Sequence, residues 1–395
     1  MTGAVRRNVL LLAFCQALFM TGTSMVITVT ALAGAICAPV PSLATLPLSL
    51  QFVATMVTTV PASYVMRRFG RRNGFIVGSL VGGVGGVISV AALVAGDFIL
   101  FCVGSSLIGV LAGFAIYYRF AAADCADEES RSRAISLVLA GGVIAAFTGP
   151  NLARFTADLI PAATFAGSFA AIAALQVLTI VLLFFIDIPR LTAAERRDQG
   201  RPIGEVLRQP AAAVAILAAV AGYSAMTLVM TATPLAVVGH NLQFGDAAII
   251  IQWHVPAMFA PSFFTGTIIK RVGVLPVIAC GALFILACVV INLQGTGVLH
   301  FTAALVALGL GWNFMFVGGT TLLTSVITRP EQAKMQGLND FLVFSFVALA
   351  SLSSGAAYQS FGWQAVNLGA IPGVTVALAA AIWLALSRPP RTVRG

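Results

Sequence analysis

The sequence predicts an all-α membrane protein in which twelve helices cross the bilayer as two halves of six. Three observations support this prediction: the composition, the spacing of long apolar runs and the placement of the basic residues. Of the 395 residues, 59% are apolar and only 9% are charged, whereas a soluble domain carries about 25% charged residues. So few charges cannot cover a surface that faces water, and the mean hydropathy of +1.00 agrees. The composition therefore excludes a soluble globular protein.

Twelve apolar runs are each long enough to cross a bilayer, which takes about 20 residues in a helix. In the first half of the chain the runs cover 8–36, 43–66, 74–96, 98–120, 134–157 and 163–186. In the second half they cover 211–238, 247–269, 275–294, 299–327, 336–358 and 363–386. A backbone inside lipid must satisfy its own hydrogen bonds, and the runs lack the short alternating pattern of a membrane barrel. We therefore expect each run to form one transmembrane helix.

The basic residues test this count, because the cytoplasmic loops of membrane proteins are enriched in Lys and Arg. With a cytoplasmic N-terminus, all of the 22 basic residues except Arg154 fall in cytoplasmic segments. A missed or additional helix would destroy this bias. The net charge of +9 therefore reflects membrane topology rather than binding to nucleic acid, and both termini are predicted to be cytoplasmic.

The start of the chain imitates a secretory signal peptide. Arg6 and Arg7 precede the first apolar run, and Ala31-Leu32-Ala33 resembles a cleavage site. The run is longer than the 7–15 residues typical of a signal peptide, and cleavage would leave an odd number of helices. We expect the first helix to be retained.

A polar stretch at 187–210 divides the chain near its middle. The segments on its two sides repeat: residues 63–70 follow the second run, and the similar residues 266–273 follow the eighth, 203 positions later. The sequence thus predicts an N-terminal six-helix bundle (1–186), a central cytoplasmic loop (187–210) and a C-terminal six-helix bundle (211–395). In such duplicated proteins the binding cavity lies between the halves.

The segment after the second run resembles the signature of the major facilitator superfamily, Gly-x-x-x-Asp-Arg-x-Gly-Arg-Arg. Four positions match it: Arg68, Gly70, Arg71 and Arg72. Ser63 replaces the first glycine and Arg67 replaces the aspartate, so the charge pairing that this acid makes between helices in the family is in doubt here. The resemblance implies the twelve-helix major facilitator fold and a transporter, and it names no substrate.

Two consecutive runs carry sulfur and imidazole donors at helical spacing. Met226 and Met230 lie at i and i+4 in the seventh run, as do His254 and Met258 in the eighth, so each pair shares one helical face. Both pairs lie at matching depths from the loop that joins the runs, which predicts two rungs of one site. Soft, uncharged donors without carboxylates or thiolates favour Cu(I). The alternative is packing, since methionine fills gaps in apolar helices, although a deep ionisable residue such as His254 is usually functional.

The same segments resemble the CcoA-type copper importers of the major facilitator superfamily. The likeness covers 252–266 and the Met-x-x-x-Met of the seventh run, and continues through 311–314, 318–321 and 336–341. It implies a bacterial inner-membrane protein that imports copper for assembly of cytochrome c oxidase. It implies copper transport by Met226, Met230, His254 and Met258, with copper as the substrate and no cofactor. The partners expected are the lipid bilayer and periplasmic or cytoplasmic copper carriers. The transporter is expected to be a monomer.

Two other functions stay open, whereas the sequence does not support an enzyme. An exporter of drugs or small metabolites would use the Met and His residues only for packing. A scaffold for oxidase assembly would need larger loops than this chain has. An enzyme is excluded because the sequence lacks a pair of membrane-embedded carboxylates, a Ser-His-Asp set and a phosphate-binding loop.

Several further residues are weaker candidates. Within predicted helices the methionines that could pass an ion along are Met20, Met25, Met56 and Met315. Near the outer surface the groups that could collect metal are His240, Asp246 and His300. Asn313 and Asp340 could be polar groups of the cavity; the alternative for Asp340 is a solvated carboxylate, because it lies near the inner end of its predicted helix. The six cysteines, at 15, 37, 102, 125, 280 and 288, form no CxxC pair and predict neither a disulfide framework nor a zinc site.

Overall fold

The computed structural model describes residues 3–125, 131–188 and 201–387, and these residues form helices joined by short connections. The first half contains α1 (Gly3–Cys37), the short 3-10 helix η1 (Pro41–Leu43), α2 (Leu46–Phe69), α3 (Arg71–Ala95), α4 (Phe98–Ala115), α5 (Tyr118–Cys125), α6 (Arg131–Thr156) and α7 (Ala166–Phe184). The second half contains α8 (Ile203–Leu207), α9 (Pro210–Gly239), α10 (Phe244–Phe259), α11 (Ser262–Val272), α12 (Val274–Gln294), α13 (Val298–Thr324) and α14 (Arg329–Ser387).

The predicted all-α membrane fold with twelve spans is confirmed. Among the described residues, nine helices are long and apolar enough to cross a bilayer, and the bent pair of α10 and α11 makes a tenth. Helix α14 reverses at Gly362, where φ is 79°, so its 59 residues supply two crossings. Helix α6, with 26 residues, completes the twelve. Half of the central loop (189–200) and the basic residues Arg388, Arg391 and Arg394 lie outside the described residues.

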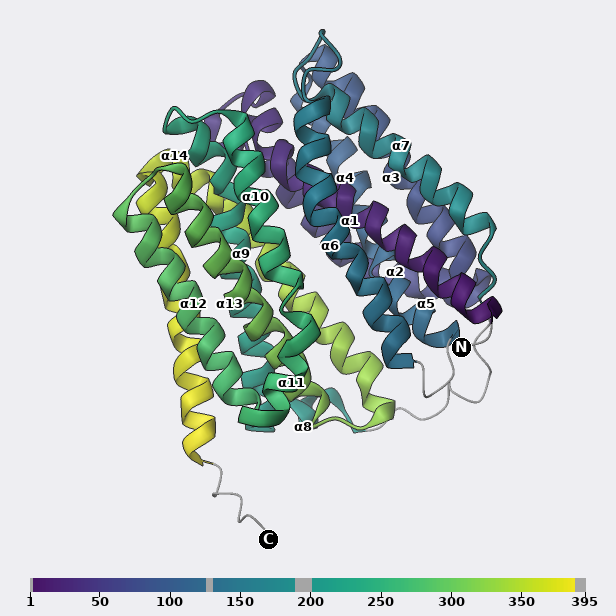
Figure 1. The fold of residues 1–395 in the computed structure, drawn as a ribbon, viewed down its shortest axis with the longest axis vertical. Helices are drawn as coiled ribbons and strands as arrows, with labels where there is room; N and C mark the ends of the chain where they lie inside the picture. The colour runs from purple at the N-terminus through teal and green to yellow at the C-terminus, as the bar shows by residue number, and fades with distance from the viewer. Residues whose placement is uncertain (1–2, 126–130, 189–200, 388–395) are drawn as a thin grey trace.

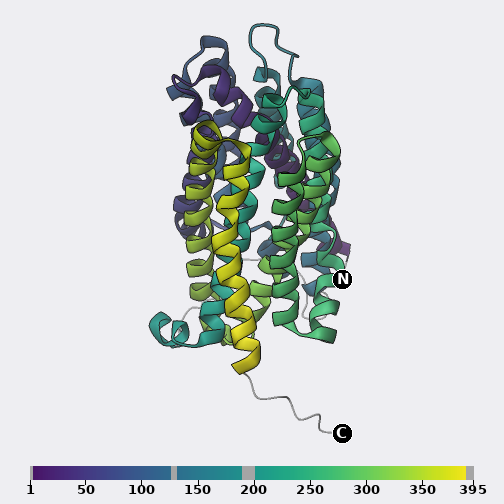
Figure 2. The same cartoon turned by 90° about the vertical axis from the view of Figure 1, so that its left-hand side faces the viewer.

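The helices are arranged as two groups, with α1 to α7 on one side and α9 to α14 on the other (Figure 1). Helix α1 begins and α14 ends at the same end of the molecule, which we call the terminal end; the opposite end is the distal end (Figure 1). After the reversal at Gly362, the second limb of α14 runs back along the first (Figure 2). Helices α2 and α11, which carry basic residues near their C-terminal ends, end at the terminal end (Figure 1).

The sequence repeat is also a repeat of backbone geometry. Gly70 joins α2 to α3 with φ 90° and ψ 153°, and Gly273 joins α11 to α12 with φ 93° and ψ 160°. The N–H of Gly70 donates to the carbonyl of Met66 at 2.9 Å, and that of Gly273 donates to Ile269 at the same distance. This backbone region is open only to glycine. The matching positions, 203 residues apart, therefore make the same sharp turn in the two halves.

One predicted helix is broken. The run at 247–269 forms α10 and α11, which meet at an angle of 43°. Proline has no N–H to donate, and Pro256 and Pro261 lie just before and at this break. Asn313 of α13 braces the break, since its Nδ2 donates to the carbonyl of Met258 at 2.7 Å and to Ser262 Oγ at 2.6 Å.

Two hydrogen bonds between the halves lie towards the distal end, and a third, from Ser345 Oγ of α14 to Met56 Sδ of α2 at 2.9 Å, lies near the middle of α2. Ser49 Oγ in α2 donates to Ser351 Oγ in α14 at 3.1 Å. Nδ2 of Asn151 in α6 donates to Oε1 of Gln252 in α10 at 2.8 Å. Both pairs lie in the parts of these helices nearer the distal end, because α2 and α10 begin there and α6 ends there.

The buried clusters show the same asymmetry among the described residues. Two clusters in the middle and distal parts combine residues of both halves: one contains Ala146 and Met226, the other Phe101 and Leu235. Two clusters near the terminal end each draw on one half, the first on residues 5–188 and the second on 206–384. The halves are therefore packed together at the distal end and separate in their packing at the terminal end.

Candidate functional site

The half-buried aromatic side chains of the second half gather around one tyrosine. The ring centroid of Tyr223 in α9 lies 5.3 Å from Trp312 and 5.5 Å from Phe316, both in α13, and 6.0 Å from Phe344 in α14. Trp312 and Phe316 are stacked, with an interplanar angle of 9°, because i and i+4 share one helical face. Phe259, at the end of α10, lies 5.7 Å from Trp312. We call these five residues the aromatic cluster.

The aromatic cluster lies where the two halves meet. Phe52 of α2 belongs to the same apolar group as Tyr223, Phe316 and Phe344. On another side, a Cβ placed on Gly142 of α6 would lie 3.4 Å from the Phe259 ring. All members of the cluster except Trp312 are partly exposed. The cluster therefore offers flat apolar ring surfaces at the boundary between halves, which suits the stacking of a planar aromatic molecule.

Two oppositely charged side chains, one from each half, lie near the aromatic cluster. The carboxylate of Asp340 in α14 interacts electrostatically with Arg119 of α5, and with Tyr223 of the aromatic cluster. Asp340 also interacts electrostatically with Tyr117, between α4 and α5. The hydroxyl of Tyr117 donates to the carbonyl of Thr59 at 3.0 Å. Polar groups of both halves thus lie near the apolar cluster, and a role for Asp340 in the cavity stays a prediction.

The four predicted copper ligands are all buried. Met226, Met230, His254 and Met258 expose 1%, 2%, 0% and 6% of their surface. Helix α13 packs more extensively against both α9 and α10 than these two helices pack against each other. Gly309 of α13 lies against the backbone of His254 and Met258, while Met315 of α13 fills the space beside Gly222 of α9. The two-rung ligand site stays a prediction.

His254 is held by a helix that the spacing argument did not involve. Its Nδ1 lies 2.6 Å from the carbonyl oxygen of Leu305 in α13. A carbonyl only accepts, so Nδ1 carries a proton. Full burial disfavours the charged ring, and the neutral ring with its proton on Nδ1 has a lone pair on Nε2. That Nε2 is buried and has no hydrogen-bond partner. The buried imidazole is therefore chemically able to act as a ligand.

The weaker candidates divide between packing, capping and contacts between halves. Met25 and Met315 are fully buried, while Met56 of α2 accepts a hydrogen bond from Ser345 Oγ of α14 at 2.9 Å. Asp246 caps α10 by accepting from the N–H of Gln243 at 2.9 Å.

The other polar candidates and the cysteines have structural surroundings. His240 Nδ1 bonds to the carbonyl of Ala236 at 2.7 Å. Asn313 is fully buried and occupied by the brace at the α10–α11 break, so it is a structural group rather than an open cavity group. All six cysteines are unpaired.

The superfamily signature keeps a charge pair although Arg67 replaces its acid. Arg71 at the start of α3 forms a 2.6 Å ion pair with Asp124 of α5. Both residues belong to the first half and lie at its terminal end. This pair joins helices within one half.

Sequence reasoning missed the aromatic cluster. The Trp312–Phe316 spacing of four residues was the available signal, but its partners come from three other helices. Their convergence depends on how α9, α10 and α14 pack around α13, which no local pattern reports.

Comparison with known proteins agrees with this architecture. Residues 9–338 match the sequence model of the Major Facilitator Superfamily. The chain is 44% identical over 377 residues to the riboflavin transporter RfnT of Brucella anthropi, covering 95% of each chain. It is 32% identical to the uncharacterized MFS-type transporter YddS of Bacillus subtilis, covering 89% of this chain and 84% of that one. These matches do not point to the CcoA-type copper importers.

Solved structures share the fold at low sequence identity. A partially occluded, inward-open conformation of the xylose transporter XylE from E. coli matches with a TM-score of 0.71 and 13% identity, covering 98% of both chains. An auto-inhibited POT family peptide transporter matches with a TM-score of 0.68 and 12% identity, covering 98% of this chain and 99% of that one. Together with the family match over residues 9–338, the twelve spans and the doubled glycine turn, this shows that the chain is a membrane transporter of the major facilitator superfamily.

Proposed function

We propose that the protein carries a planar aromatic metabolite, riboflavin or a closely related flavin, across the bacterial inner membrane by alternating access. The observation that carries the proposal is the aromatic cluster at the boundary between the halves. A flavin ring system is flat and apolar on its faces, so it can stack on rings such as Tyr223 and Phe316. Its polar edge requires hydrogen-bonding groups, and Asp340, Arg119 and Tyr117 lie in the same region. The 44% identity to a riboflavin transporter supports this class of cargo.

We assign the structure to the inward-facing state. The basic loops place the terminal end in the cytoplasm by the positive-inside rule. The hydrogen bonds and mixed buried clusters that join the halves lie in the distal and middle parts. In this scheme the closed distal end blocks access to the cavity from the periplasm. When the halves rock, the distal end opens and the terminal end closes.

Copper is the second candidate, and one observation favours it. The buried, unpartnered Nε2 of His254 is a suitable donor for a soft metal ion. The relatives give copper no support, and in the flavin proposal Met226 and Met258 pack in the same buried cluster as Trp312. The two proposals make different demands on His254, because copper transport requires its imidazole and flavin stacking does not.

Uptake assays separate the proposals. Cells that cannot make riboflavin are expected to accumulate radiolabelled riboflavin when they express the protein, and Tyr223→Ala is expected to lower that uptake by tenfold or so, since lost aromatic contacts cost roughly 1 kcal/mol or more. Phe155→Ala is the matched control, because Phe155 is 76% exposed and lies outside the cluster. Copper accumulation that depends on the protein and is lost in His254→Gln, without any riboflavin uptake, would replace the flavin proposal with the copper one.

A further inference from the structure

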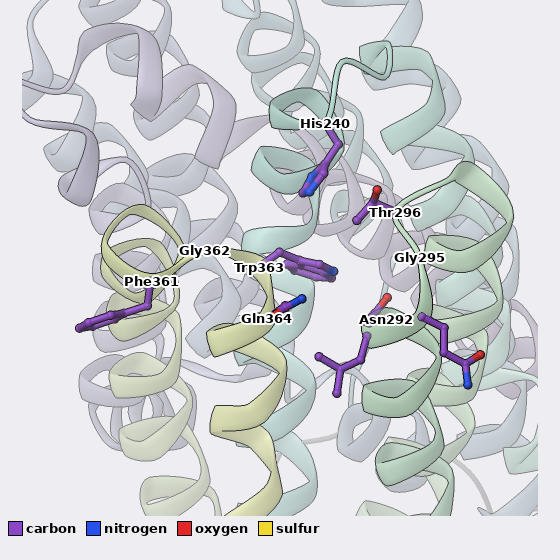
Figure 3. A pocket seen from close by; sticks show the side chains of 10 residues that line it. His240, Asn292, Gly295, Thr296, Phe361, Gly362, Trp363 and Gln364 are labelled. Atoms are coloured by element: carbon purple, nitrogen blue, oxygen red, sulfur yellow. The ribbon is translucent and has the colours of Figure 1, made fainter.

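A pocket lies at the distal end, inside the second half and away from the aromatic cluster. Its volume is about 410 Å³, and it is bounded by the end of α9, the end of α12 with its loop, and the reversal of α14 at Gly362. Figure 3 shows the polar side chains of His240, Asn292, Thr296 and Gln364 around this space, with the indole of Trp363 forming one wall. We call it the distal pocket.

Two buried polar atoms at the distal pocket lack a hydrogen-bond partner. Trp363 is 4% exposed and its Nε1–H has no acceptor; Asn292 is 2% exposed and its Oδ1 has no donor. A buried polar group without a partner costs about 1–3 kcal/mol. The residues that line the pocket therefore include one donor and one acceptor, from α14 and α12, that no protein group satisfies.

The orientation of the Asn292 amide is fixed by a chain of hydrogen bonds. Nδ2 of Asn367 donates to the carbonyl of Trp363 at 2.8 Å, so Oδ1 is the acceptor end of Asn367. Nδ2 of Asn292 donates to that oxygen at 2.7 Å. The free atom of Asn292 is thus its oxygen, and the bonds that fix it also join α12 to the second limb of α14.

The aromatic wall is equally fixed. The ring of Trp363 lies 5.3 Å from Phe301, and Phe301 lies 6.2 Å from the imidazole of His240. Phe301 is fully buried and supports both rings from behind. The donor of Trp363 is therefore held in place before any ligand arrives.

The chemistry of the lining selects a neutral ligand. Among the described residues that line the distal pocket, none is Asp, Glu, Lys or Arg, so the pocket offers no counter-charge for an ion. It offers amides, a hydroxyl, an imidazole and an indole N–H spread around one hollow. A hydroxyl group both donates and accepts, so a chain of hydroxyls can meet such mixed partners in sequence. The volume is far larger than the roughly 30 Å³ of one water molecule.

We propose that the distal pocket is a binding site for a small, uncharged, polyhydroxylated molecule, held between Asn292 and Trp363. This site does not depend on the cargo proposed above, because it lies outside the boundary between the halves. On the topology given above, it opens towards the periplasm.

Equilibrium dialysis of radiolabelled ribitol against the purified full-length protein tests the proposal. Saturable binding is expected for the wild type. Asn292→Leu keeps the approximate volume but removes the acceptor, and is expected to weaken binding by about tenfold or more. Trp363→Phe removes the donor and keeps an aromatic wall, so it is expected to weaken ribitol binding as well. It provides the test if Asn292→Leu does not fold.

Gln176→Leu is the matched control. Gln176 of α7 is another buried amide, 1% exposed, with an unpartnered Oε1, and it lies in the other half. Its substitution should leave ribitol binding unchanged. The proposal is overturned if the wild type shows no saturable binding, which would mean that the pocket holds only water. It is equally overturned if both pocket variants bind ribitol as the wild type does.

Discussion

Nδ2 of Asn151 in the first half donates a 2.8 Å hydrogen bond to Oε1 of Gln252 in the second. This bond joins α6 to α10 near the distal end, and a second bond, between Ser49 and Ser351, joins α2 to α14. A transporter that alternates between two states must break both when the distal end opens.

We expect Asn151→Leu to favour the opposite state. A hydrogen bond contributes about 0.5–1.5 kcal/mol, so the equilibrium should shift by up to about tenfold. Spin labels on cysteines placed at the exposed positions Leu159 and Leu299, after replacement of the native cysteines, would show a larger population at long distance. Asn73→Leu is the control, since Asn73 bonds only within its own turn, to Phe69, in the first half. An unchanged distance distribution in Asn151→Leu would show that this bond does not hold the distal end closed.

A disulfide should trap the observed state. The Oγ atoms of Ser49 and Ser351 are 3.1 Å apart, which is compatible with the short Cβ–Cβ distance that a disulfide needs. In a background without native cysteines, the double variant Ser49→Cys/Ser351→Cys is expected to cross-link under oxidation and to lose transport. Reductant should restore transport, and each single variant should stay active in oxidant. Full transport by the cross-linked protein would contradict the assignment of this contact to one state of the cycle.

The paired glycine turns should be equally sensitive to a side chain. Gly70 has open space around its Cβ position and Gly273 has only Pro276 at 3.7 Å, so alanine meets no clash at either site. The cost arises from the backbone conformation and should be roughly 1–3 kcal/mol in each half. Melting temperatures of Gly70→Ala and Gly273→Ala should fall. Gly266 also has open space around its Cβ position, but it lies inside α11. The melting temperature of Gly266→Ala should not fall, because alanine favours a helix.

The Arg201–Glu331 pair predicts a pH dependence of stability. The hydrogen bond from Arg201 is the main cause that lowers the pKa of Glu331 well below its ordinary 4.5, and the N–H of Thr328 contributes. A carboxyl group with a lowered pKa in the folded protein stabilises the fold above its ordinary pKa, and this stabilisation is lost as the pH falls below it. The melting temperature of the wild type should therefore exceed that of Glu331→Gln by a constant amount from about pH 5 to 8. The difference should shrink in acid; a difference that grows in acid would refute this role.

The sequence was sufficient to predict the helix count, the repeat and the burial of the site residues. Hydropathy and the positions of basic residues report directly on membrane spans, and the Gly70 and Gly273 segments carry the repeat. Pro256 and Pro261 indicate the break between α10 and α11, but the apolar run that contains them predicted one continuous helix. Burial of His254 followed from its place in an apolar run.

The packing of the site could not be predicted in the same way. The argument for a copper site assumed that consecutive helices are close neighbours, whereas α13 packs against both α9 and α10. The partner of His254, Leu305, and the meeting of Tyr223 with Phe344 both depend on that three-dimensional order. The spacing of Met226 with Met230 and of His254 with Met258 gave the predicted ligands, and the resemblance to the copper importers reinforced them. The relative that is 44% identical over nearly the whole chain is a riboflavin transporter.

The most direct test of the flavin proposal is the fluorescence of riboflavin titrated with the purified protein. Stacking against tyrosine or tryptophan quenches flavin emission, so the wild type is expected to quench it saturably. Trp312→Leu and Tyr223→Ala should weaken or abolish the quenching, and Phe155→Ala should leave it intact. Equal quenching by all four proteins, or none by the wild type, would contradict a flavin site at the aromatic cluster.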